Sequence, residues 1–463
     1  MSQKTQKLRS GDRGGLVLNV RSYVSVIPRI VKENTVTKIK ITPKFAFIKL
    51  SGRYNISVLP KYYYHSEGRI AKYDVLTVEA ANNCIEFSFA FGKEQEYCLQ
   101  ICSEYKNGNK DTMIQTSVYA LSDDLYSLKV VKGELHQHTI YSDGIESPEH
   151  RIAIARQHGM DYIAITDHNS YEGSLRAINV LSRCPNNMIA LHGEEVHADF
   201  CPVHILSLGA HNAIAPLVTN RNHEQMERLL RIEEKHENLL DGDVELRSFA
   251  SAVDVFEQIK EANGLSVLCH IYWDAIVFEN KTRMGVPEQL VNALVEYSVF
   301  DAFEITSGAP PTDTKANFLQ EAYYRENLPR DLPIIGITDS HSTDSKMGTI
   351  FAKNYTIAFV AEFSESGIID AIKKYNTVSV DAVTGETVCH GSLRLCKYAS
   401  FLIEEYFPTH DKIVSIEGLY MERLLLNTEL DFGQMDNLCK NSSTLLMEEW
   451  EKIIPQKKNI SYL

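Results

Sequence analysis

The chain has little that would mark it as a membrane or secreted protein. Among its 463 residues, no apolar run approaches the roughly 20 residues that cross a bilayer. Its first fifteen residues are polar and lack the apolar core of a signal peptide. No internal repeat and no low-complexity segment occurs. We therefore expect a globular protein without a membrane partner.

Cysteine is present, but not in any pattern that indicates pairing. The nine cysteines are scattered, odd in number and without a Cys-x-x-Cys pair. A disulfide framework usually has an even number of cysteines at regular spacing, and structural zinc sites usually have close pairs. We therefore expect reduced thiols and a cytoplasmic location.

Positive charge is scarce. The chain has 47 Lys and Arg residues against 61 Asp and Glu, a net charge of -14. Proteins that bind DNA or RNA without regard to sequence rely on clustered cations, so we expect no such binding. A small nucleotide held through metals is not excluded. The motifs of serine hydrolases, P-loop enzymes and dinucleotide-binding folds are also missing.

The composition is otherwise that of an ordinary globular protein, in a length that suits two or three domains. Hydrophobic residues make up 44% of the chain and charged residues 23%. The pattern predicts an α/β protein in four parts: a flexible arm at 1–15, a β-sandwich-like domain at 16–125, an alternating α/β domain at 133–381 and a helical C-terminal extension at 382–463.

The segment 16–125 has an all-β pattern. Runs such as Lys38–Thr42 and Asn55–Leu59 alternate with period two, and further runs follow about 10 to 20 residues apart, as in a sandwich. Asn107–Lys110 is a predicted hairpin loop. Because no cluster of acids, bases or ligands occurs here, we expect a packing or lid domain. The alternative is a ligand-binding module, or one through which the protein forms oligomers.

The stretch from Gly133 to Asn169 organises the rest of the chain. His136 and His138 stand two apart in a strand-like run, and such residues point the same way, about 7 Å apart at the backbone. Asp143 follows in a turn. A second short apolar run then delivers Asp167 and His168 at its carboxyl end, where α/β folds place their sites.

A helix is predicted between these two strands. Ser147 is its expected N-cap, Pro148 suits its first position, and Gly159 ends it. One His-x-His pair alone would be weak, since most single histidines pack in the core. The order of His-x-His, Ser-Asp-Gly, helix, apolar strand and Thr-Asp-His predicts a metal site.

Later strands supply more donors. The strand expected at Met188–Val196 carries Glu194 and Glu195, which face opposite ways, so only one can line the site. His204 opens the next strand, and His270 ends a buried one. Two further donors, Asp339 and His341, repeat the spacing of the first histidine pair. Glu304 is expected either to support a metal ligand or to form a salt bridge rather than to bind metal, and Cys269 is expected to point away from the site.

These motifs resemble those of the PHP (polymerase and histidinol phosphatase) superfamily of metal-dependent phosphoesterases, over about Gly133 to Asp381. The resemblance implies a distorted (β/α)7 barrel and favours Glu195 over Glu194. The chain departs from the common pattern twice. Glu134 stands where Asp is usual before Leu-His, and Cys269-His270-Ile271 replaces Ala-His-Pro.

The resemblance also implies up to three metal ions. Manganese, zinc and iron fit, since the expected donors are nitrogen and oxygen atoms without thiolate. The first ion would use His136, His138, Glu195 and Asp339. The second would share Glu195 and add His204 and His270. The third would use Asp143, His168 and His341. Asp143, His168 and Asp167 are the expected catalytic residues, with Asp167 orienting an imidazole.

The expected function is a metal-dependent hydrolase, a phosphoesterase or phosphatase of small phosphorylated substrates. A carbamate or ester hydrolase on the same fold is an alternative. A metal-stabilised binding module without catalysis is another, although the retention of all nine donors counts against it. Three basic residues are candidates for binding phosphate because they lie near these metal-binding motifs in the sequence: Arg183, Lys281 and Lys346.

Overall fold

The fold is that of a computed structural model, and it forms two compact units. One unit comprises residues up to Tyr126 with 447–460, and the other comprises residues 127–446 with 461–463. The structure describes residues 16–19, 23–62, 74–103, 112–271, 274–277, 282–298, 300–306, 322, 326, 332–344, 351–383, 385–426 and 432–454. The predicted arm at 1–15 and the predicted hairpin loop at Asn107–Lys110 lie outside these residues.

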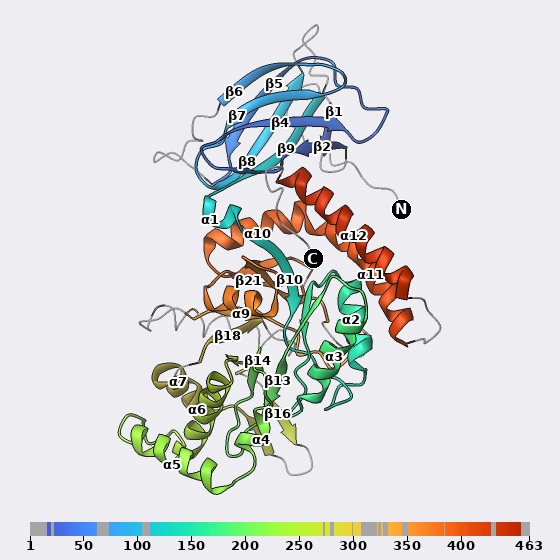
Figure 1. The fold of residues 1–463 in the computed structure, drawn as a ribbon. Helices are drawn as coiled ribbons and strands as arrows, with labels where there is room; N and C mark the ends of the chain where they lie inside the picture. The colour runs from blue at the N-terminus through green and yellow to red at the C-terminus, as the bar shows by residue number, and fades with distance from the viewer. Residues whose placement is uncertain are drawn as a thin grey trace. The chain divides into compact units, whose positions relative to one another are not determined.

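The first unit consists of two β-sheets (Figure 1). Its larger sheet contains β1 (Leu16–Asn19), β3 (Ile30–Lys32), β5 (Gly52–Pro60), β6 (Asp74–Ala80), β8 (Gln95–Ser103) and β9 (Thr112–Leu121). Its smaller sheet contains β2 (Val24–Ile27), β4 (Val36–Pro43) and β7 (Ile85–Ala90). The short helix α1 (Asp123–Tyr126) follows the last strand.

The two sheets enclose one apolar core, as the period-two pattern predicts. Ile39 and Ile41 of β4 are fully buried, as are Ile56 of β5 and Ile101 of β8, and all four belong to the same hydrophobic cluster. In each strand, the residues between these positions are more exposed. The alternation therefore separates an inner apolar face from an outer polar face.

The second unit contains two mixed sheets and a two-stranded hairpin. One sheet has the order β12-β11-β10-β20-β21-β22 and the other has the order β13-β14-β15-β18-β19. Their bounds are β10 (Lys129–Glu134), β11 (Tyr162–Ala164), β12 (Ile189–Leu191), β20 (Asn354–Val360), β21 (Thr377–Asp381), β22 (Val388–His390), β13 (Gly193–Val196), β14 (Ile205–Leu208), β15 (Leu265–Leu268), β18 (Ala302–Thr306) and β19 (Ile334–Gly336). The hairpin is β16 (Asp274–Val277) with β17 (Thr282–Gly285).

The alternation of strands and helices at 133–381 predicts a largely parallel sheet or barrel, but the strands run in mixed directions. Parallel pairs join β10 to β11, β11 to β12, β15 to β18 and β18 to β19, but five other pairs in these two sheets are antiparallel. Chain length gives one reason. Only residues 197–204 connect β13 to β14, and a parallel crossover needs a dozen residues or more.

The strand expected at Met188–Val196 is broken at His192. Its first half is β12 and its second half is β13, and the two halves belong to different sheets. Isolated bridges between Gln137 and Ser340 and between His168 and Glu195 link the two sheets beyond their strand ends. Among the described residues, the strands form these two bridged sheets, so a single closed seven-stranded barrel is not confirmed.

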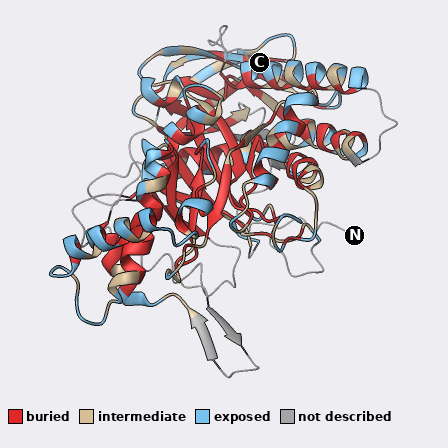
Figure 2. Ribbon diagram, turned by 60° about the horizontal axis from the view of Figure 1, so that its bottom comes forward, coloured by how far each residue is buried: buried red, intermediate tan, exposed pale blue. Residues whose placement is uncertain are grey.

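Helices cover the outer faces of the two sheets (Figure 1). On the β12 side they are α2 (Pro148–Gln157), α3 (Glu172–Arg183), α9 (Glu365–Lys373), α10 (Leu393–Glu405) and α11 (Phe407–Leu426), followed by α12 (Phe432–Ile453). On the other side they are α4 (Ala215–Val218), α5 (His223–His236), α6 (Leu246–Glu261) and α7 (Glu288–Tyr297). Figure 2 shows the central strands as buried, with exposed residues mainly on the outer faces of helices.

The helix predicted after the first motif forms as expected. Ser147 caps α2 by accepting a hydrogen bond from the amide of His150, and Pro148 is its first residue. Gly159, at φ +84°, follows the end of the helix in the left-handed region that glycine favours.

Buried ion pairs fasten α11 to α2. Arg156 is fully buried and donates to Glu417 at 2.7 Å and to Asp161 at 2.8 Å. His410 Nε2 lies 3.0 Å from Asp161, and its Nδ1 lies 3.0 Å from Asp411. In its described residues, the predicted extension at 382–463 is mainly helical, but it also contains strand β22. In addition, α10 and α11 lie in the same compact unit as the strands before residue 381. The expected domain boundaries stay a prediction.

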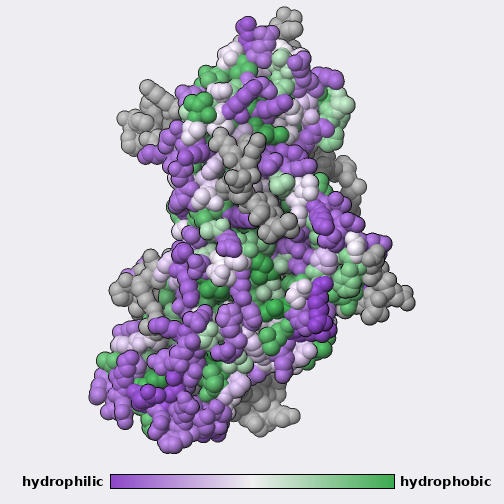
Figure 3. Space-filling model, viewed as in Figure 1, coloured by the Kyte–Doolittle hydropathy of each residue, from purple (hydrophilic) through white to green (hydrophobic). Residues whose placement is uncertain are grey.

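The run of charged residues around α5 predicts a solvated face, and the structure has one. Leu229 and Ile232 are buried against α6, whereas the glutamates at 224, 227 and 234 are exposed or partly exposed. The surface over this region is mostly hydrophilic in Figure 3. Among the described residues, no helix is long and apolar enough to cross a membrane.

Candidate metal centre

The first two histidines lie just beyond β10 rather than within it. Their backbone is extended, because Gln137 between them bridges to Ser340. Both imidazoles therefore turn to the same side, and their Nε2 atoms lie 3.1 Å apart. Each Nε2 also lies within 3.3 Å of Oδ1 of Asp339. The predicted pair of chelating histidines thus comes together through an isolated bridge.

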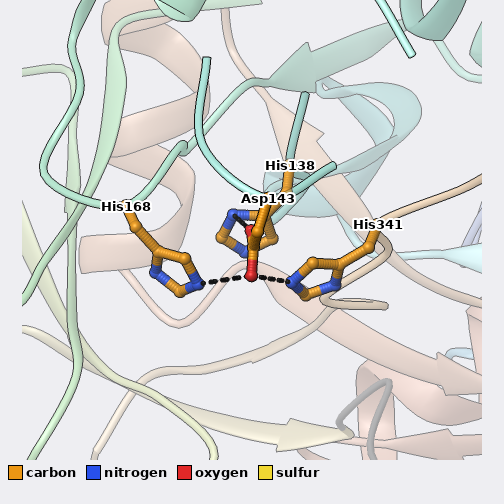
Figure 4. Close-up of side chains that lie close together, drawn as sticks. All are labelled: His138, Asp143, His168 and His341. Carbon is orange, nitrogen blue, oxygen red and sulfur yellow. Dashed lines mark ion pairs between the residues drawn. The ribbon is translucent and has the colours of Figure 1, made fainter. Parts of the chain in front are cut away.

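Asp143 stands between two further imidazoles (Figure 4). Its Oδ2 lies 3.4 Å from Nε2 of His168 and 3.2 Å from Nε2 of His341. Its Oδ1 lies 3.7 Å from Nδ1 of His138. The tight turn needs Gly144, since a Cβ atom there would collide with the backbone of His138.

Glu195 lies at the centre of the remaining donors, fully buried. Its Oε2 lies 3.2 Å from Nε2 of both His136 and His138, and 2.8 Å from Nδ1 of His168. Its Oε1 lies 2.9 Å from Nδ1 of His204 and from Nε2 of His270. The nine residues expected to bind metal therefore converge around Glu195, Asp143 and Asp339.

Two of these donors have unusual backbone conformations. His270 follows β15 with φ +22°, and Asp339 follows β19 with φ +49°. A non-glycine residue in such a region costs on the order of 1–3 kcal/mol and persists only where the surroundings enforce it. Both residues lie just after a strand, where the backbone must turn their side chains towards the centre.

The electrostatic field of the centre favours cations. Burial alone would raise the pKa of Glu195, but the surrounding imidazoles, His136 first, hold it well below its usual range. Burial alone would lower the pKa of His168, but Asp143 and Glu195 raise it to about 10. Burial lowers the pKa of His204 to about 4, so that ring is neutral, as metal ligands must be.

Several buried donor atoms also lack hydrogen bonds. Oε2 of Glu195 and Nδ1 of His168 are 2.8 Å apart, yet neither makes a hydrogen bond to any described atom. The same holds for Nδ1 of His136 and of His270. Buried polar atoms are nearly always satisfied, so the unsatisfied ones here fit a centre built around divalent ions. The donors are nitrogen and oxygen atoms, as expected for manganese, zinc or iron.

Asp167 was expected to orient an imidazole, but its side chain instead accepts hydrogen bonds from the loop that carries Asp143. Its Oδ1 accepts hydrogen bonds from the amide of Thr139 at 2.6 Å and from the hydroxyl of Ser142 at 2.7 Å. Its Oδ2 accepts one from the hydroxyl of Thr139 at 2.7 Å. Ser142 Oγ in turn lies 3.4 Å from Nδ1 of His138. Asp167 therefore acts on the imidazole only through the loop that carries Asp143.

The other carboxylates of this region face elsewhere. Glu194 accepts hydrogen bonds from the amides of Ile214 and Ala215 at the start of α4, which agrees with the choice of Glu195 as donor. Glu304 accepts a hydrogen bond from the amide of His270, in the supporting role that was expected. Glu134, the departure from the family pattern, accepts hydrogen bonds from the amides of Leu135, His136 and Thr338.

Sequence reasoning missed two residues at the centre. His197 groups with His168 and Glu195, and its only sequence signal is its position two residues after Glu195, on the same side of the chain. Cys269 was expected to point away. Instead it groups with His136 and His270, and its Sγ lies 3.9 Å from Oε1 of Glu195.

Arg151 was also missed. This buried residue of α2 donates to Glu146 at 3.1 Å and to the carbonyl of Ser340. Glu146 accepts hydrogen bonds from the amide and hydroxyl of Thr343. Arg151 therefore ties the loop that carries Asp143 to the loop that carries His341.

The structure does not support any of the three residues that were candidates for binding phosphate. Arg183 is exposed at the last residue of α3, a helix that begins near the centre at Glu172. Eleven residues of helix span about 16 Å, so Arg183 lies at the far end. Lys281 and Lys346 lie outside the described residues.

Three solved structures resemble parts of the chain. A two-domain protein from Bacteroides vulgatus ATCC 8482, containing a predicted PHP-like metal-dependent phosphoesterase, is 17% identical with a TM-score of 0.35, over 55% of this chain and 65% of that one. A provisionally named metal-dependent phosphoesterase from Bifidobacterium adolescentis ATCC 15703 is 18% identical with a TM-score of 0.30, over 45% and 87%. An amidohydrolase from Chromobacterium violaceum with bound sulfate and no metal is 18% identical with a TM-score of 0.28, over 44% and 87%.

The chain thus spans less than two thirds of the first of these proteins, and none of the three likenesses carries a conclusion about function. No curated protein matches the chain.

The family model described as the PHP domain matches residues 134–261, which include His136, Asp143, His168 and Glu195. Residues 134–261 are therefore similar to the PHP domain.

Proposed function

We propose that the protein is a metal-dependent hydrolase, and that it is a phosphoesterase acting on small phosphorylated molecules. One observation carries the proposal. Imidazoles surround both carboxylate oxygens of Glu195, while Asp143 at the edge of the same cluster keeps 55% of its side chain exposed. A buried group of donors beside an accessible carboxylate suits a centre that holds ions and admits a substrate.

The nine donors fit the three ion positions expected from the family. His136, His138, Glu195 and Asp339 would hold the first, Glu195 with His204 and His270 the second, and Asp143 with His168 and His341 the third. Divalent ions bound there would supply an activated water and neutralise charge that develops on the substrate. Manganese, zinc and iron remain the proposed metals, and their number is proposed as two or three.

Asp143 and His168 are the residues that we propose to face the substrate. His168 presents Nε2 to Asp143 and Nδ1 to Glu195, so carboxylates direct both ring nitrogens and fix the ring plane. Asp167 holds the loop from Thr139 to Ser142 and is proposed as a positioning residue.

We also propose that the two sheets are an opened form of the seven-stranded barrel that the family resemblance implies. The isolated bridges at Gln137 and His168 support this, since each joins the end of a strand in one sheet to a segment that follows or belongs to the other. Apolar side chains of both sheets also share one core, including Tyr162 and Val267.

Hydrolysis of carboxylic esters or carbamates is a second candidate, favoured by the loop that carries Asp143. Three of its large apolar side chains are exposed: Ile140 at 61%, Tyr141 at 41% and Ile145 at 58%. The backbone amides of this loop are hydrogen-bonded, so these side chains are held at the surface by an ordered turn. Such a rim suits a substrate with an apolar group beside its scissile bond.

A substrate screen tests these proposals. Protein purified without chelator is assayed for phosphate release from aryl and sugar phosphates, and in parallel for cleavage of aryl esters and carbamates. We expect phosphate release, and we expect His136→Ala and Asp339→Ala to lower it more than a hundredfold, beyond the effect of losing a supporting residue. The control His223→Ala removes an imidazole with an 86% exposed side chain and should leave the rate unchanged.

Circular dichroism must show that the variants remain folded. Turnover of an aryl phosphate that persists in folded His136→Ala or Asp339→Ala contradicts the metal-dependent mechanism. Cleavage of esters or carbamates alone selects the second candidate. Bound metal without turnover of any substrate would favour a binding module.

A further inference from the structure

Three imidazoles converge on a single carboxylate oxygen, Oε1 of Glu195. Nδ1 of His204 and Nε2 of His270 each lie 2.9 Å from it. The third is His197, whose Nε2 lies 3.6 Å away and which is not one of the nine expected donors. The convergence on this oxygen therefore includes one more nitrogen than the family resemblance implies.

His197 is held firmly in this position. Its amide donates to Oδ1 of Asn169 at 2.7 Å, and Nδ2 of Asn169 donates to its carbonyl at 3.0 Å. The amide of Asn169 donates to the carbonyl of Glu195 at 2.9 Å, which ties the pair to β13. The ring stacks on that of His204, with centroids 3.5 Å apart and planes inclined by 24°. His197 is therefore an ordered part of the centre.

Nε2 of His197 is buried although the side chain as a whole is partly exposed. Its side chain is 31% exposed, but Nε2 has no accessible surface and makes no hydrogen bond to any described atom. At 3.6 Å the separation from Glu195 is too long for a hydrogen bond. An unsatisfied buried nitrogen aimed at a carboxylate needs another partner.

A divalent cation accounts for this arrangement better than hydrogen bonds do. Only the nitrogens of His204 and His270 lie within hydrogen-bond distance of Oε1, so hydrogen bonds to Glu195 leave Nε2 of His197 without a partner. Around a tetrahedral zinc ion with bonds of about 2.0–2.2 Å, neighbouring ligand atoms lie about 3.3–3.6 Å apart. The separations of 2.9 to 3.6 Å between Glu195 and the three imidazoles are close to that spacing.

We propose that His197 is a metal ligand, and that it completes with Glu195, His204 and His270 a four-residue site for a divalent cation such as zinc. The proposal rests on the proposed function in that it concerns the second ion of the same centre. Four protein ligands close a tetrahedral site, and closed sites are structural, whereas catalytic sites keep a position open. The accessible chemistry then belongs to the side of Asp143.

Stacking offers a competing role, in which His197 merely steadies the ring of His204. Two substitutions separate the roles. His197→Ala removes both the nitrogen and the stacked ring, whereas His197→Phe keeps an aromatic ring and removes only the nitrogen. A matched control is His192→Ala, because His192 also pairs with a carboxylate, at 3.0 Å from Glu365, and is 21% exposed, outside the centre.

The experiment measures zinc bound by the full-length protein in chelator-buffered solutions, with cobalt substitution to record the ligand-field spectrum. We expect His197→Ala and His197→Phe both to bind one equivalent more than a hundredfold more weakly, beyond the 10–100-fold effect of a supporting residue. The cobalt spectrum of both should lose the intensity typical of four-coordinate sites. His192→Ala should bind as the unsubstituted protein does.

Wild-type zinc affinity in His197→Phe would overturn the proposal in favour of stacking, and wild-type affinity in His197→Ala would remove any role in binding. If His197→Phe does not fold, by circular dichroism, the spectrum of cobalt-saturated His197→Ala decides, because loss of stacking alone would leave the intensity of a four-coordinate site unchanged. No substrate enters the measurement, so it fails separately from the proposed function. A protein that binds zinc as expected and hydrolyses nothing contradicts only the proposed function, whereas one that binds no zinc contradicts both.

Discussion

Asp167 receives hydrogen bonds from both the amide and the hydroxyl of Thr139, at 2.6 and 2.7 Å. A single buried carboxylate thus fixes the start of the loop that presents Asp143. The hydroxyl of Ser142 donates to the same carboxylate and fixes the other end of that loop. The position of the exposed donor is therefore set by a residue that lies on a different strand end.

We expect Asp167→Asn to weaken binding of the ion at Asp143. The amide nitrogen of asparagine cannot accept the hydrogen bonds that the carboxylate accepts, so the loop loosens. Loss of such a supporting residue typically costs 10–100-fold in metal affinity. Metal titration of the variant checks this, with Asp370→Asn as control because Asp370 is a surface residue paired with Lys374. Unchanged affinity in Asp167→Asn would contradict the role given to the loop.

Removal of metal should lower the thermal stability of the protein. In the absence of ions, the buried Glu195 and the partly buried Asp339 lie among imidazoles that must carry protons to balance them. A ligand that binds the folded state alone stabilises it, by about 2.7 kcal/mol at a hundred times its Kd. We expect chelation to lower Tm and added zinc or manganese to restore it. Equal melting curves with and without chelator would argue against a built metal centre.

A substitution at Gly418 should separate α11 from α2. A Cβ atom at this position would stand 2.7 Å from the carbonyl oxygen of Ala153 and closer still to the amide nitrogen of Gln157. Alanine favours helices by about 1 kcal/mol over glycine. We nevertheless expect Gly418→Ala to destabilise the protein by about 1–3 kcal/mol, as overpacking usually does.

Thermal melting checks this prediction against Gly242→Ala, where an added Cβ meets nothing within 4 Å. The control should melt near the temperature of the unsubstituted protein. Gly418→Ala should melt several degrees lower, since about 1 kcal/mol shifts Tm by about 2–4 °C in a domain of this size. A higher Tm for Gly418→Ala than for the unsubstituted protein would contradict the predicted collision between the two helices.

The contribution of His410 to stability should depend on pH. Burial alone would lower its pKa, but Asp161 first and then Asp411 raise it above its usual value. Burial alone would raise the pKa of Asp161, but His410 and Arg156 lower it to about 2. The imidazolium is thus stabilising below about pH 6.5 and loses its effect as the pH rises through the raised pKa. The carboxylate is stabilising above about pH 3.9 and loses its effect as the pH falls towards 2.

We therefore expect His410→Gln to cost the most stability between about pH 4 and pH 6.5, and less as the pH rises further. Denaturant melts of both proteins across this range give the difference. The other groups that face His410 are the rings of Tyr406 and Phe407, which do not titrate here, and Lys132, which pairs with Asp411. A difference that is constant with pH would mean that His410 contributes by packing alone.

Local patterns predicted most of the elements of this fold. The cap at Ser147 and the strands β4 and β5 follow from the properties of neighbouring residues, which do not depend on distant parts of the chain. The break at His192 was not predicted, because both halves of the run are apolar and only the pairing with β11 on one side and β14 on the other separates them. The mixed direction of the strands was not predicted for the same reason, because it too depends on which strands pair.

The donors were predictable for a related reason. Each lies near the end of an apolar run, so its sequence context could be read locally, and all nine lie close together. His197 could not be recognised this way, since its place depends on Asn169, a residue 28 positions earlier. The indirect action of Asp167 and the turn of Cys269 towards Glu195 were likewise set by long-range contacts.

The bridge between Gln137 and Ser340 joins segments that are separated by about two hundred residues of chain. During translation, the ribosome must therefore add Asp339 and His341 long after the first histidines have left the exit tunnel. A nascent chain stopped at residue 261 would carry His136, His138 and His168 without the two donors that complete their groups. If the proposed ions bind, the groups that contain Asp339 and His341 can be complete only after synthesis has passed residue 341.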